Sequence, residues 1–156
     1  MHASTRVYPM VLEALMKLPL AGSCQCGKIR YEITEAPQLV YTCLHRLSAD
    51  HEQRLLVGNR FAGGRLATLP RGEPRPLRRM ADSGRLNTRF VCSDCACWLY
   101  SLPHDGVIRV RAGTLDDTSW LRPTRHIWTR SKQPWVSFAE GDETFEGEPP
   151  GQIGCA

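Results

Sequence analysis

The sequence predicts a single, mainly β domain made of short strands joined by many turns. Apolar and polar residues alternate with a period of two in residues 29–34 and 107–112, which is the pattern of strands with one buried face. Helical periodicity is weak outside residues 10–18. The length of 156 residues, of which 42% are hydrophobic and 23% charged, suits one folded domain with a modest core.

The expected strands follow one another along the chain. Residues 21–34 are expected to form a turn and then a strand, because Ile29, Tyr31 and Ile33 alternate with polar side chains. Residues 107–112 alternate in the same way, and the GTLDD stretch that follows them is rich in turn-forming residues. Further short strands are expected at residues 39–43 and, from their aromatic and β-branched content, at residues 126–131 and 134–138.

Residues 44–79 interrupt this pattern. They lack clean alternation and contain GNRFAGGR and PRGEPRPLRR, so we expect a loop, although so long a loop is unusual inside a compact domain. Arginines in residues 44–71 carry most of the net charge of +4, against Asp50 and Glu52. They are Arg46, Arg54, Arg60, Arg65 and Arg71. Aromatic residues are not interleaved with them in a nucleic-acid-binding pattern, so no nucleic-acid partner is expected.

Targeting and membrane signals are weak. No apolar run approaches the roughly 20 residues of a membrane span. Glu13, Lys17 and Pro19 interrupt the N-terminal apolar stretch, which makes it a poor signal peptide. We therefore expect a cytoplasmic protein with no membrane partner, and the sequence does not indicate its oligomeric state. The expected domain spans residues 16–148, between an N-terminal extension (1–15), with Met16 as an alternative start, and a tail (149–156).

The seven cysteines indicate metal or redox chemistry rather than disulfides. Four of them form two close pairs beside turns, Cys24 with Cys26 and Cys92 with Cys95. Zinc prefers four soft ligands in a tetrahedron, and two such pairs supply them once folding brings them together. Four buried free thiols are the plainer alternative. A redox role for Cys92 and Cys95 is disfavoured, because no βαβ pattern surrounds them.

A zinc site closed by four cysteines has no open position, so catalysis would need a second site. Cys43 and His45, in YTCLHRLSAD, are the nearby candidates, because their spacing lets both side chains point to one face of a strand. No good third ligand is present: Ser48 and Asp50 are poor substitutes, and His51 is the remaining candidate. A buried cysteine beside a surface histidine is therefore the favoured interpretation.

Four blocks of sequence resemble the glutathione-dependent formaldehyde-activating enzyme (GFA)/CENP-V family. They are GSCQCGKIRYE (22–32), FVCSDC (90–95), AGTLDD (112–117) and HIWTRSKQPW (126–135), in the family's order. The resemblance implies an Mss4-like fold of short antiparallel strands around a structural zinc held by Cys24, Cys26, Cys92 and Cys95. It also implies carbon–sulfur lyase chemistry, in which glutathione adds to formaldehyde to give S-hydroxymethylglutathione. A second zinc in the family is held by a C-H-C-x-x-C motif.

The sequence departs from the family at that second motif. Residues 43–48 read CLHRLS, so only the first cysteine matches. We therefore expect the second, catalytic zinc site to be disrupted, with Cys43 as its remnant, His45 as a degenerate ligand and no intact catalytic residue. A glutathione-type thiol and an aldehyde are the small-molecule partners that the family implies. The alternative function is a non-enzymatic, zinc-stabilised module that binds a protein.

A shifted reading frame would account for the departure. One codon choice for residues 44–56, read one base later, encodes Cys-Thr-Asp-Cys-Gln-Arg-Ile-Met-Ser-Ser-Ala-Phe. This reading restores the family's C-x-x-C motif and the S-A-F stretch that follows it. We hypothesise that residues 44–71 are a frame-shifted family segment, produced by loss of two bases after Cys43 and recovery near Gly72. His45 would then be an accident of the reading frame.

The remaining candidates each have a structural interpretation. His126 suits an acid–base group and a hydrogen-bonded core position equally well. Asp116 and Asp117 are expected in a turn or helix cap rather than as a catalytic carboxylate pair. For Cys97, packing is expected rather than a role as a spare ligand, and for Trp128 and Trp135, core packing rather than the lining of a ligand groove. Arg125, Arg130 and Lys132 are expected to be solvated surface charges rather than to bind glutathione carboxylates. No role is expected for Cys155 in the tail.

Overall fold

The computed structural model describes most of the expected domain. The described residues are 17–37, 39–44, 54–59, 67–68, 72–80, 84, 86–103 and 108–150, and for 54–59, 67–68 and 103 only the backbone is described. In these residues the chain forms eleven strands and two short 3-10 helices, which confirms the prediction of a mainly β fold. No helix in the described part of the chain is long and apolar enough to cross a membrane.

The strands are short and follow closely on one another. They are β1 (Leu20–Ser23), β2 (Arg30–Ile33), β3 (Leu39–Cys43), β4 (Arg54–Asn59), β5 (Ala67–Thr68), β6 (Arg75–Met80), β7 (Leu86–Val91), β8 (Trp98–Pro103), β9 (Ile108–Arg111), β10 (Arg125–Ile127) and β11 (Glu143–Thr144). The 3-10 helices are η1 (Ala112–Thr114), directly after β9, and η2 (Thr129–Ser131), shortly after β10.

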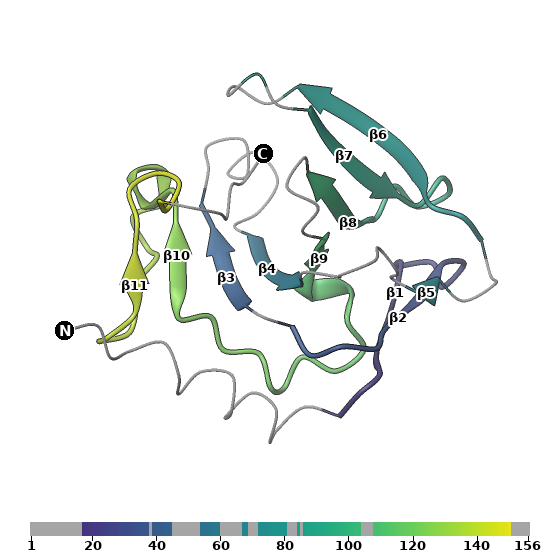
Figure 1. Cartoon of the computed structure of the whole chain (residues 1–156), viewed down its shortest axis with the longest axis horizontal. Coiled ribbons are helices and arrows are strands. Elements are labelled where there is room, and N and C mark those ends of the chain that lie inside the picture. The colour runs from purple at the N-terminus through teal and green to yellow at the C-terminus, as the bar shows by residue number, and fades with distance from the viewer. Residues whose placement is uncertain are drawn as a thin grey trace.

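The strands form two sheets. The smaller sheet has the order β1-β2-β5, and the larger has the order β11-β10-β3-β4-β9-β8-β7-β6. Figure 1 shows the larger sheet running from β11 on one side of the molecule to the β6–β7 hairpin on the other, with the smaller sheet near β9. Most pairs are antiparallel, as predicted, but β10 pairs in parallel with both β3 and β11.

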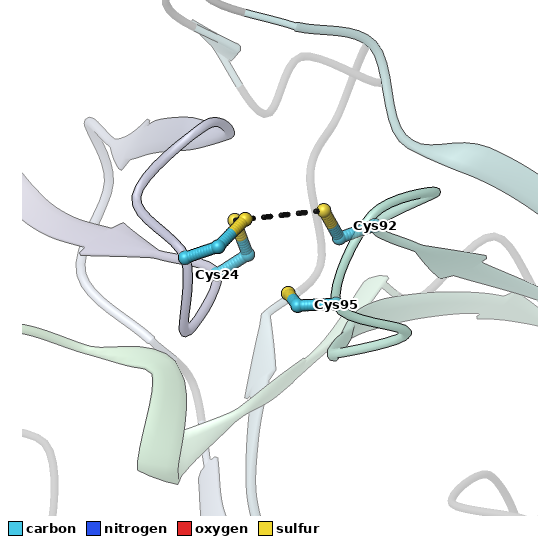
Figure 2. A group of neighbouring side chains, drawn as sticks. Cys24, Cys92 and Cys95 are labelled. Carbon is cyan, nitrogen blue, oxygen red and sulfur yellow. Dashed lines mark hydrogen bonds between the residues drawn. The ribbon is translucent and has the colours of Figure 1, made fainter.

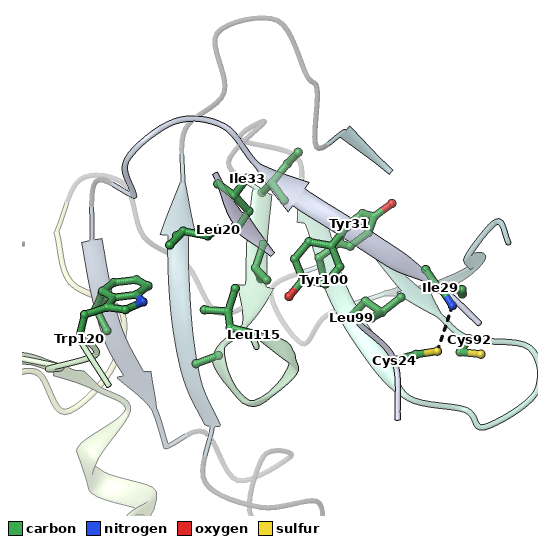
Figure 3. Packing of buried hydrophobic residues seen from close by; sticks show 14 residues of the cluster. Leu20, Cys24, Ile29, Tyr31, Ile33, Cys92, Leu99, Tyr100, Leu115 and Trp120 are labelled. Atoms are coloured by element: carbon green, nitrogen blue, oxygen red, sulfur yellow. Dashed lines mark hydrogen bonds between the residues drawn. The ribbon is translucent and has the colours of Figure 1, made fainter. Parts of the chain in front are cut away.

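The main core lies between the smaller sheet and the middle of the larger one. Ile29, Tyr31 and Ile33 are buried, so the alternation that predicted this strand also identifies its inner face. They pack with Leu99 and Val110 of the larger sheet in one apolar cluster. Figure 3 shows this cluster extending from Trp120 at one end to Cys24 and Cys92 at the other. Two of the candidate metal ligands are therefore part of the core.

A second, smaller apolar cluster lies where the larger sheet becomes parallel. Tyr41 and Cys43 of β3 pack there with Ile127 of β10. The backbone of β10 is tied to β3 by their parallel pairing and by a 2.9 Å hydrogen bond from the Leu44 N–H to the Ile127 carbonyl. Phe145, just after β11, packs against the same cluster.

The prediction of a loop over residues 44–79 is wrong, because β4, β5 and β6 lie inside it. β4 lies between β3 and β9 in the larger sheet, and its short apolar run (LLV) has no period-two alternation by which a strand could be identified. β6 is the edge strand of the larger sheet and is mostly exposed, so it tolerates Pro76 and several arginines. Neither strand has the half-buried pattern that identified β2.

Other strand predictions are correct in part. The strand expected at residues 126–131 ends at Ile127, because Trp128 has a left-handed backbone (φ 61°) and η2 follows. Residues 134–138 form turns and irregular backbone rather than a strand. The strands expected at 39–43 and 107–112 are confirmed as β3 and β9, and strands β1, β7, β8 and β11 were not expected from the sequence.

Candidate metal centre

The first pair of cysteines lies in the tight loop between β1 and β2. The Cys24 N–H donates to the Ile29 carbonyl at 3.0 Å, and the Gly27 N–H donates back to the Cys24 carbonyl at 3.0 Å. Gly27 has φ +74°, a left-handed conformation that glycine adopts without steric cost. These bonds close the loop, so Cys24 and Cys26 lie on the same short turn.

The second pair lies in the loop between β7 and β8, which has a similar construction. The Cys92 N–H donates to the Cys97 carbonyl at 2.9 Å, and the Ala96 N–H donates to the Cys92 carbonyl at 3.0 Å. Ala96 supplies the left-handed residue here, with φ 56°. Each loop thus presents two thiols from a turn fixed by backbone hydrogen bonds.

Folding brings the two loops face to face. The Sγ atoms of Cys24, Cys26, Cys92 and Cys95 all lie within 4.8 Å of one another. Cys26 Sγ lies 3.4 Å from Cys24 Sγ and 3.7 Å from Cys92 Sγ, and Figure 2 shows the thiols of both loops turned toward a common centre. A tetrahedral zinc with Zn–S bonds of about 2.3 Å has sulfurs about 3.8 Å apart. The donor set and its spacing therefore fit a four-thiolate metal ion.

Burial and hydrogen bonds differ among the four thiols. Cys24 and Cys92 are buried, whereas Cys95 is half-buried and Cys26 is exposed. Burial raises the pKa of Cys24. The Ile29 N–H donates to Cys24 Sγ at 3.2 Å, and this bond together with the neighbouring thiols outweighs burial, so the pKa of Cys24 is lowered overall. A hydrogen bond from the Cys97 backbone is the main reason that the pKa of Cys95 falls to about 6. Backbone N–H groups thus favour the thiolate form that binds a metal.

The pKa of Cys26 is shifted upward, in contrast to those of Cys24 and Cys95. The Lys28 backbone N–H lowers the pKa of Cys26, but its sulfur contacts, of which Cys24 is the strongest, raise this pKa to about 12. Four closely spaced thiols cannot all lose their protons without a compensating positive charge. A divalent cation would provide that charge, and binding it would release the remaining protons.

Two further residues border the cysteine group. Lys28 Nζ and Asp94 Oδ1, one from each loop, form an exposed ion pair of 2.8 Å. The half-buried Cys97 thiol packs against the core, and burial raises its pKa. It is not among the four thiols that meet at the centre, which agrees with the packing role expected for it.

Of the residues expected at a degenerate second site, Cys43 is the one that lies in the described part of the chain. Cys43 is buried at the end of β3, in the smaller apolar cluster. Its sulfur is in a disulfide bond, which the sequence did not predict, since a cysteine count does not reveal pairing. His45, Ser48, Asp50 and His51 lie outside the described residues. Among the described residues, the four-cysteine group is the one set of three or more metal-binding side chains that meet.

His126 has a hydrogen-bonded core position. It is 6% exposed, and its ring stacks on Phe138 with centroids 4.3 Å apart. Its Nε2 lies 2.9 Å from Asp142 Oδ2, and its Nδ1 lies 2.6 Å from Thr42 Oγ1. An ionised carboxylate accepts only, so Nε2–H donates to Asp142, and Nδ1 and the Thr42 hydroxyl share the second hydrogen bond. Sequence reasoning missed both partners, which are 84 and 16 positions away from His126.

The other candidates have local structural roles, with one correction. Asp117 accepts from the Ser119 backbone and hydroxyl at 2.9 and 2.7 Å, as expected for a turn residue. Asp116 pairs with Arg30, and Arg125 pairs with Glu143. Trp135 was expected in the core but is 77% exposed, because it lies in the turn after η2.

Comparison with known proteins agrees with these observations. The family model described as "Glutathione-dependent formaldehyde-activating enzyme" (GFA) matches residues 19–131, which include both cysteine loops and β10. No curated protein matches the chain. The matched residues make up more than half of the sequence, and the chain therefore belongs to the GFA family.

Proposed function

We propose that this chain is a zinc protein in which one structural zinc ion is held by Cys24, Cys26, Cys92 and Cys95. The single observation that carries the proposal is the convergence of four thiols within 4.8 Å. Zinc suits a four-thiolate donor set better than oxygen-preferring ions such as magnesium or calcium. Bound there, the ion would link the loop between β1 and β2 to the loop between β7 and β8.

Such a site stabilises the fold and does not process a substrate. Four thiolates fill the tetrahedral coordination of zinc, so no position is left for a water molecule or a thiol substrate. The site is also continuous with the core, because Cys24 and Cys92 belong to the main apolar cluster. The metal and the core are therefore expected to stabilise each other.

We further propose that the chain lacks efficient carbon–sulfur chemistry of the family type, such as adding glutathione to formaldehyde. That chemistry would use a thiolate as nucleophile, which a second, open zinc site would supply. Residues 43–48 lack two of the three cysteines of the family's second motif. The remaining cysteine, Cys43, is buried and disulfide-bonded rather than available as a thiolate.

Metal content and turnover test these two proposals together. Purified chain is expected to contain about one zinc ion, measured by mass spectrometry of the metal against protein concentration. Cys24→Ser and Cys92→Ser should abolish zinc binding, whereas the matched control Cys97→Ser should retain it. The adduct of glutathione and formaldehyde should form no faster with the chain than without it. Zinc binding that survives Cys24→Ser would contradict the first proposal, and two zinc ions with turnover would contradict the second.

One observation favours a protein-binding role as the second candidate function. Met80, Leu86 and Leu102 are 60%, 46% and 40% exposed, at neighbouring positions on β6, β7 and β8. Exposed apolar groups on adjacent strands are typical of an interaction surface. A zinc-loaded chain without turnover would agree with this role, whereas turnover with glutathione and formaldehyde would favour the enzymatic one.

A further inference from the structure

β6 (Arg75–Met80) is the last strand at one end of the larger sheet. It pairs with β7 on one side, and among the described strands none pairs with its other side. Figure 1 shows β6 at the outer end of this sheet, away from β11. An edge strand presents a row of backbone N–H and C=O groups to which another extended segment can bind. The outer edge of β6 is therefore a candidate interaction surface.

Pro76 indicates which backbone groups of β6 point outward. Proline has no N–H, and within a sheet it is found where its nitrogen points away from the ladder. Successive residues of a strand direct their N–H and C=O groups to alternate sides, so Arg78 and Met80 direct theirs to the same side as Pro76. The outer edge thus offers the N–H donors of Arg78 and Met80, together with the carbonyls of these two residues and of Pro76.

The side chains of β6 combine positive charge with exposed apolar surface. Arg75 and Arg78 are exposed and Arg79 is partly exposed, whereas the sequences of β6 and β7 contain no acidic residue. Leu77 is 44% exposed and Met80 is 60% exposed. Successive side chains of a strand project to opposite faces. Leu77 therefore shares one face with Arg75 and Arg79, and Met80 shares the other face with Arg78.

The face with Met80 extends onto β7 and β8. Met80 is the Cα partner of Leu86, and Arg78 is the partner of Thr88, which is in turn the partner of Leu102. Cross-strand partners project to the same face, so the exposed side chains of Leu86 and Leu102 lie on the same face as Met80. Exposed apolar groups on adjacent strands favour a protein partner. Binding of single-stranded nucleic acid relies on aromatic side chains for stacking, and β6 contains none.

The charge of β6 decides between two kinds of partner strand. A second copy of β6 would bring two sets of arginines into adjacent strands without any acidic residue. Proline and charged side chains on an edge strand also oppose pairing between identical chains. An acidic strand would instead place carboxylates beside the guanidinium groups. The charge therefore favours an acidic partner over self-association.

We propose that β6 binds an extended, acidic segment of a partner protein, which adds to the larger sheet as an antiparallel strand. The segment would place acidic side chains opposite Arg75, Arg78 and Arg79 and apolar side chains opposite Leu77 and Met80. In the direction of the antiparallel segment, this pattern is apolar, acidic, acidic, apolar, any residue, acidic. The proposal rests on protein binding, the second candidate function, and does not depend on the four-cysteine centre.

Fluorescence anisotropy of a labelled peptide with this pattern, Val-Glu-Glu-Val-Thr-Glu, tests the proposal on the full-length, zinc-loaded chain. We expect saturable binding at constant ionic strength. A peptide with lysine in place of each glutamate should bind at least about tenfold more weakly, because like charges then meet. N-methylation of the second glutamate, the one opposite Arg78, removes a backbone donor and leaves the charge unchanged. It should weaken binding about fivefold or more.

Two charge reversals form a matched pair. Arg78→Glu should weaken the Kd of the acidic peptide about tenfold or more, because it replaces an attraction by a repulsion. Arg130 is exposed beyond β10, near the opposite end of the sheet, with its Cζ 4.6 Å from the centroid of the Trp128 ring. Arg130→Glu should leave the Kd within about twofold. Arg75→Glu, also on the exposed part of β6, decides the question should Arg78→Glu fail to fold.

Hydrogen exchange gives a backbone readout that charge alone would not change. The Arg78 and Met80 amides should exchange more slowly with the acidic peptide bound, because they gain hydrogen bonds. The proposal is overturned if the acidic peptide does not bind saturably, or if its N-methylated form binds as tightly. Tighter binding of a single-stranded oligothymidine would also overturn it, as would a dimer that protects the same amides without peptide. Zinc content measured on the same samples separates these outcomes from failure of the proposed zinc site.

Discussion

Cys26 Sγ lies 3.7 Å from Cys92 Sγ, although 66 positions separate the two residues in the chain. The contact joins the loop of the smaller sheet to a loop of the larger sheet, and among the described strands none of one sheet pairs with a strand of the other. Closing so long a chain segment costs conformational entropy, which the apolar core between the sheets must offset. A metal ion at this contact would bind the folded chain and not the unfolded one, and so stabilise the folded arrangement.

Removing the metal is therefore expected to destabilise the whole domain. With zinc bound, a strong chelator should lower the Tm by about 10 °C or more, because structural zinc contributes directly to folding free energy. Differential scanning fluorimetry with and without chelator measures the shift, and re-addition of zinc should reverse it. The Cys24→Ser variant should melt at the lower temperature in both conditions. If chelator does not change the Tm of the wild-type chain, the stability of the four-cysteine centre does not depend on a metal.

The four cysteines could be predicted from the sequence because their signal is local. Each pair is close in sequence and lies beside a turn, so the chemistry of the ligands indicates the site before the fold is known. β2 was predictable for a similar reason, because its alternating residues have one face in the core. Both predictions depend on only a few consecutive residues.

The burial of Arg109 and the partners of His126 could not be predicted in this way. Arg109 belongs to the polar half of the alternation in β9, which for an isolated strand indicates solvent, yet it is 3% exposed. Its burial depends on which strands lie beside β9 and what lies over them. Asp142 likewise reaches His126 through a loop that returns from β10 to β11, and no spacing rule indicates that contact.

Replacing His126 should destabilise the parallel part of the larger sheet. His126→Ala removes two side-chain hydrogen bonds and the ring stacked on Phe138, and it leaves the buried Asp142 carboxylate without its imidazole partner. We expect a loss of about 2–4 kcal/mol in the free energy of unfolding, measured by urea denaturation. Thr42→Val is the milder variant, with an expected loss of about 1 kcal/mol, because only one hydrogen bond is removed. Equal losses for the two variants would contradict the bridging role of the imidazole.

The same contact predicts a loss of stability in acid. The hydrogen bond from His126 holds the pKa of Asp142 below its ordinary value of 3.8, although burial acts in the opposite direction. A carboxyl group with a depressed folded-state pKa contributes stability above pH 3.8, and this contribution is lost as the pH falls through the folded-state pKa. Wild-type and Asp142→Asn chains should therefore differ in Tm at pH 6 and converge as the pH approaches about 2. A constant difference over this range would show that the carboxylate charge is not involved.

Gly22 is expected to be intolerant of any side chain. A Cβ at this position would overlap the Tyr31 ring and come too close to the Thr114 backbone carbonyl. Tyr31 is fully buried and held by a 2.6 Å hydrogen bond to Thr114 Oγ1, so neither neighbour can move freely. Gly22→Ala should cost about 3 kcal/mol or more in the free energy of unfolding. The matched control is Gly113→Ala, where a Cβ meets nothing within 4 Å and the effect should be below about 1 kcal/mol.

The nucleotide sequence of the gene across codons 43–72 tests the frame-shift hypothesis directly. We expect the frame that starts one base later to encode a C-x-x-C motif followed by S-A-F, and an unrelated reading there would refute the hypothesis. The hypothesis also has a biochemical consequence. A chain rebuilt in the corrected frame should bind about two zinc ions, because it regains the thiolates of the second site, whereas the chain with CLHRLS at residues 43–48 should bind about one. If the rebuilt chain also accelerates the reaction of glutathione with formaldehyde, the missing activity is assigned to these residues rather than to the four-cysteine centre.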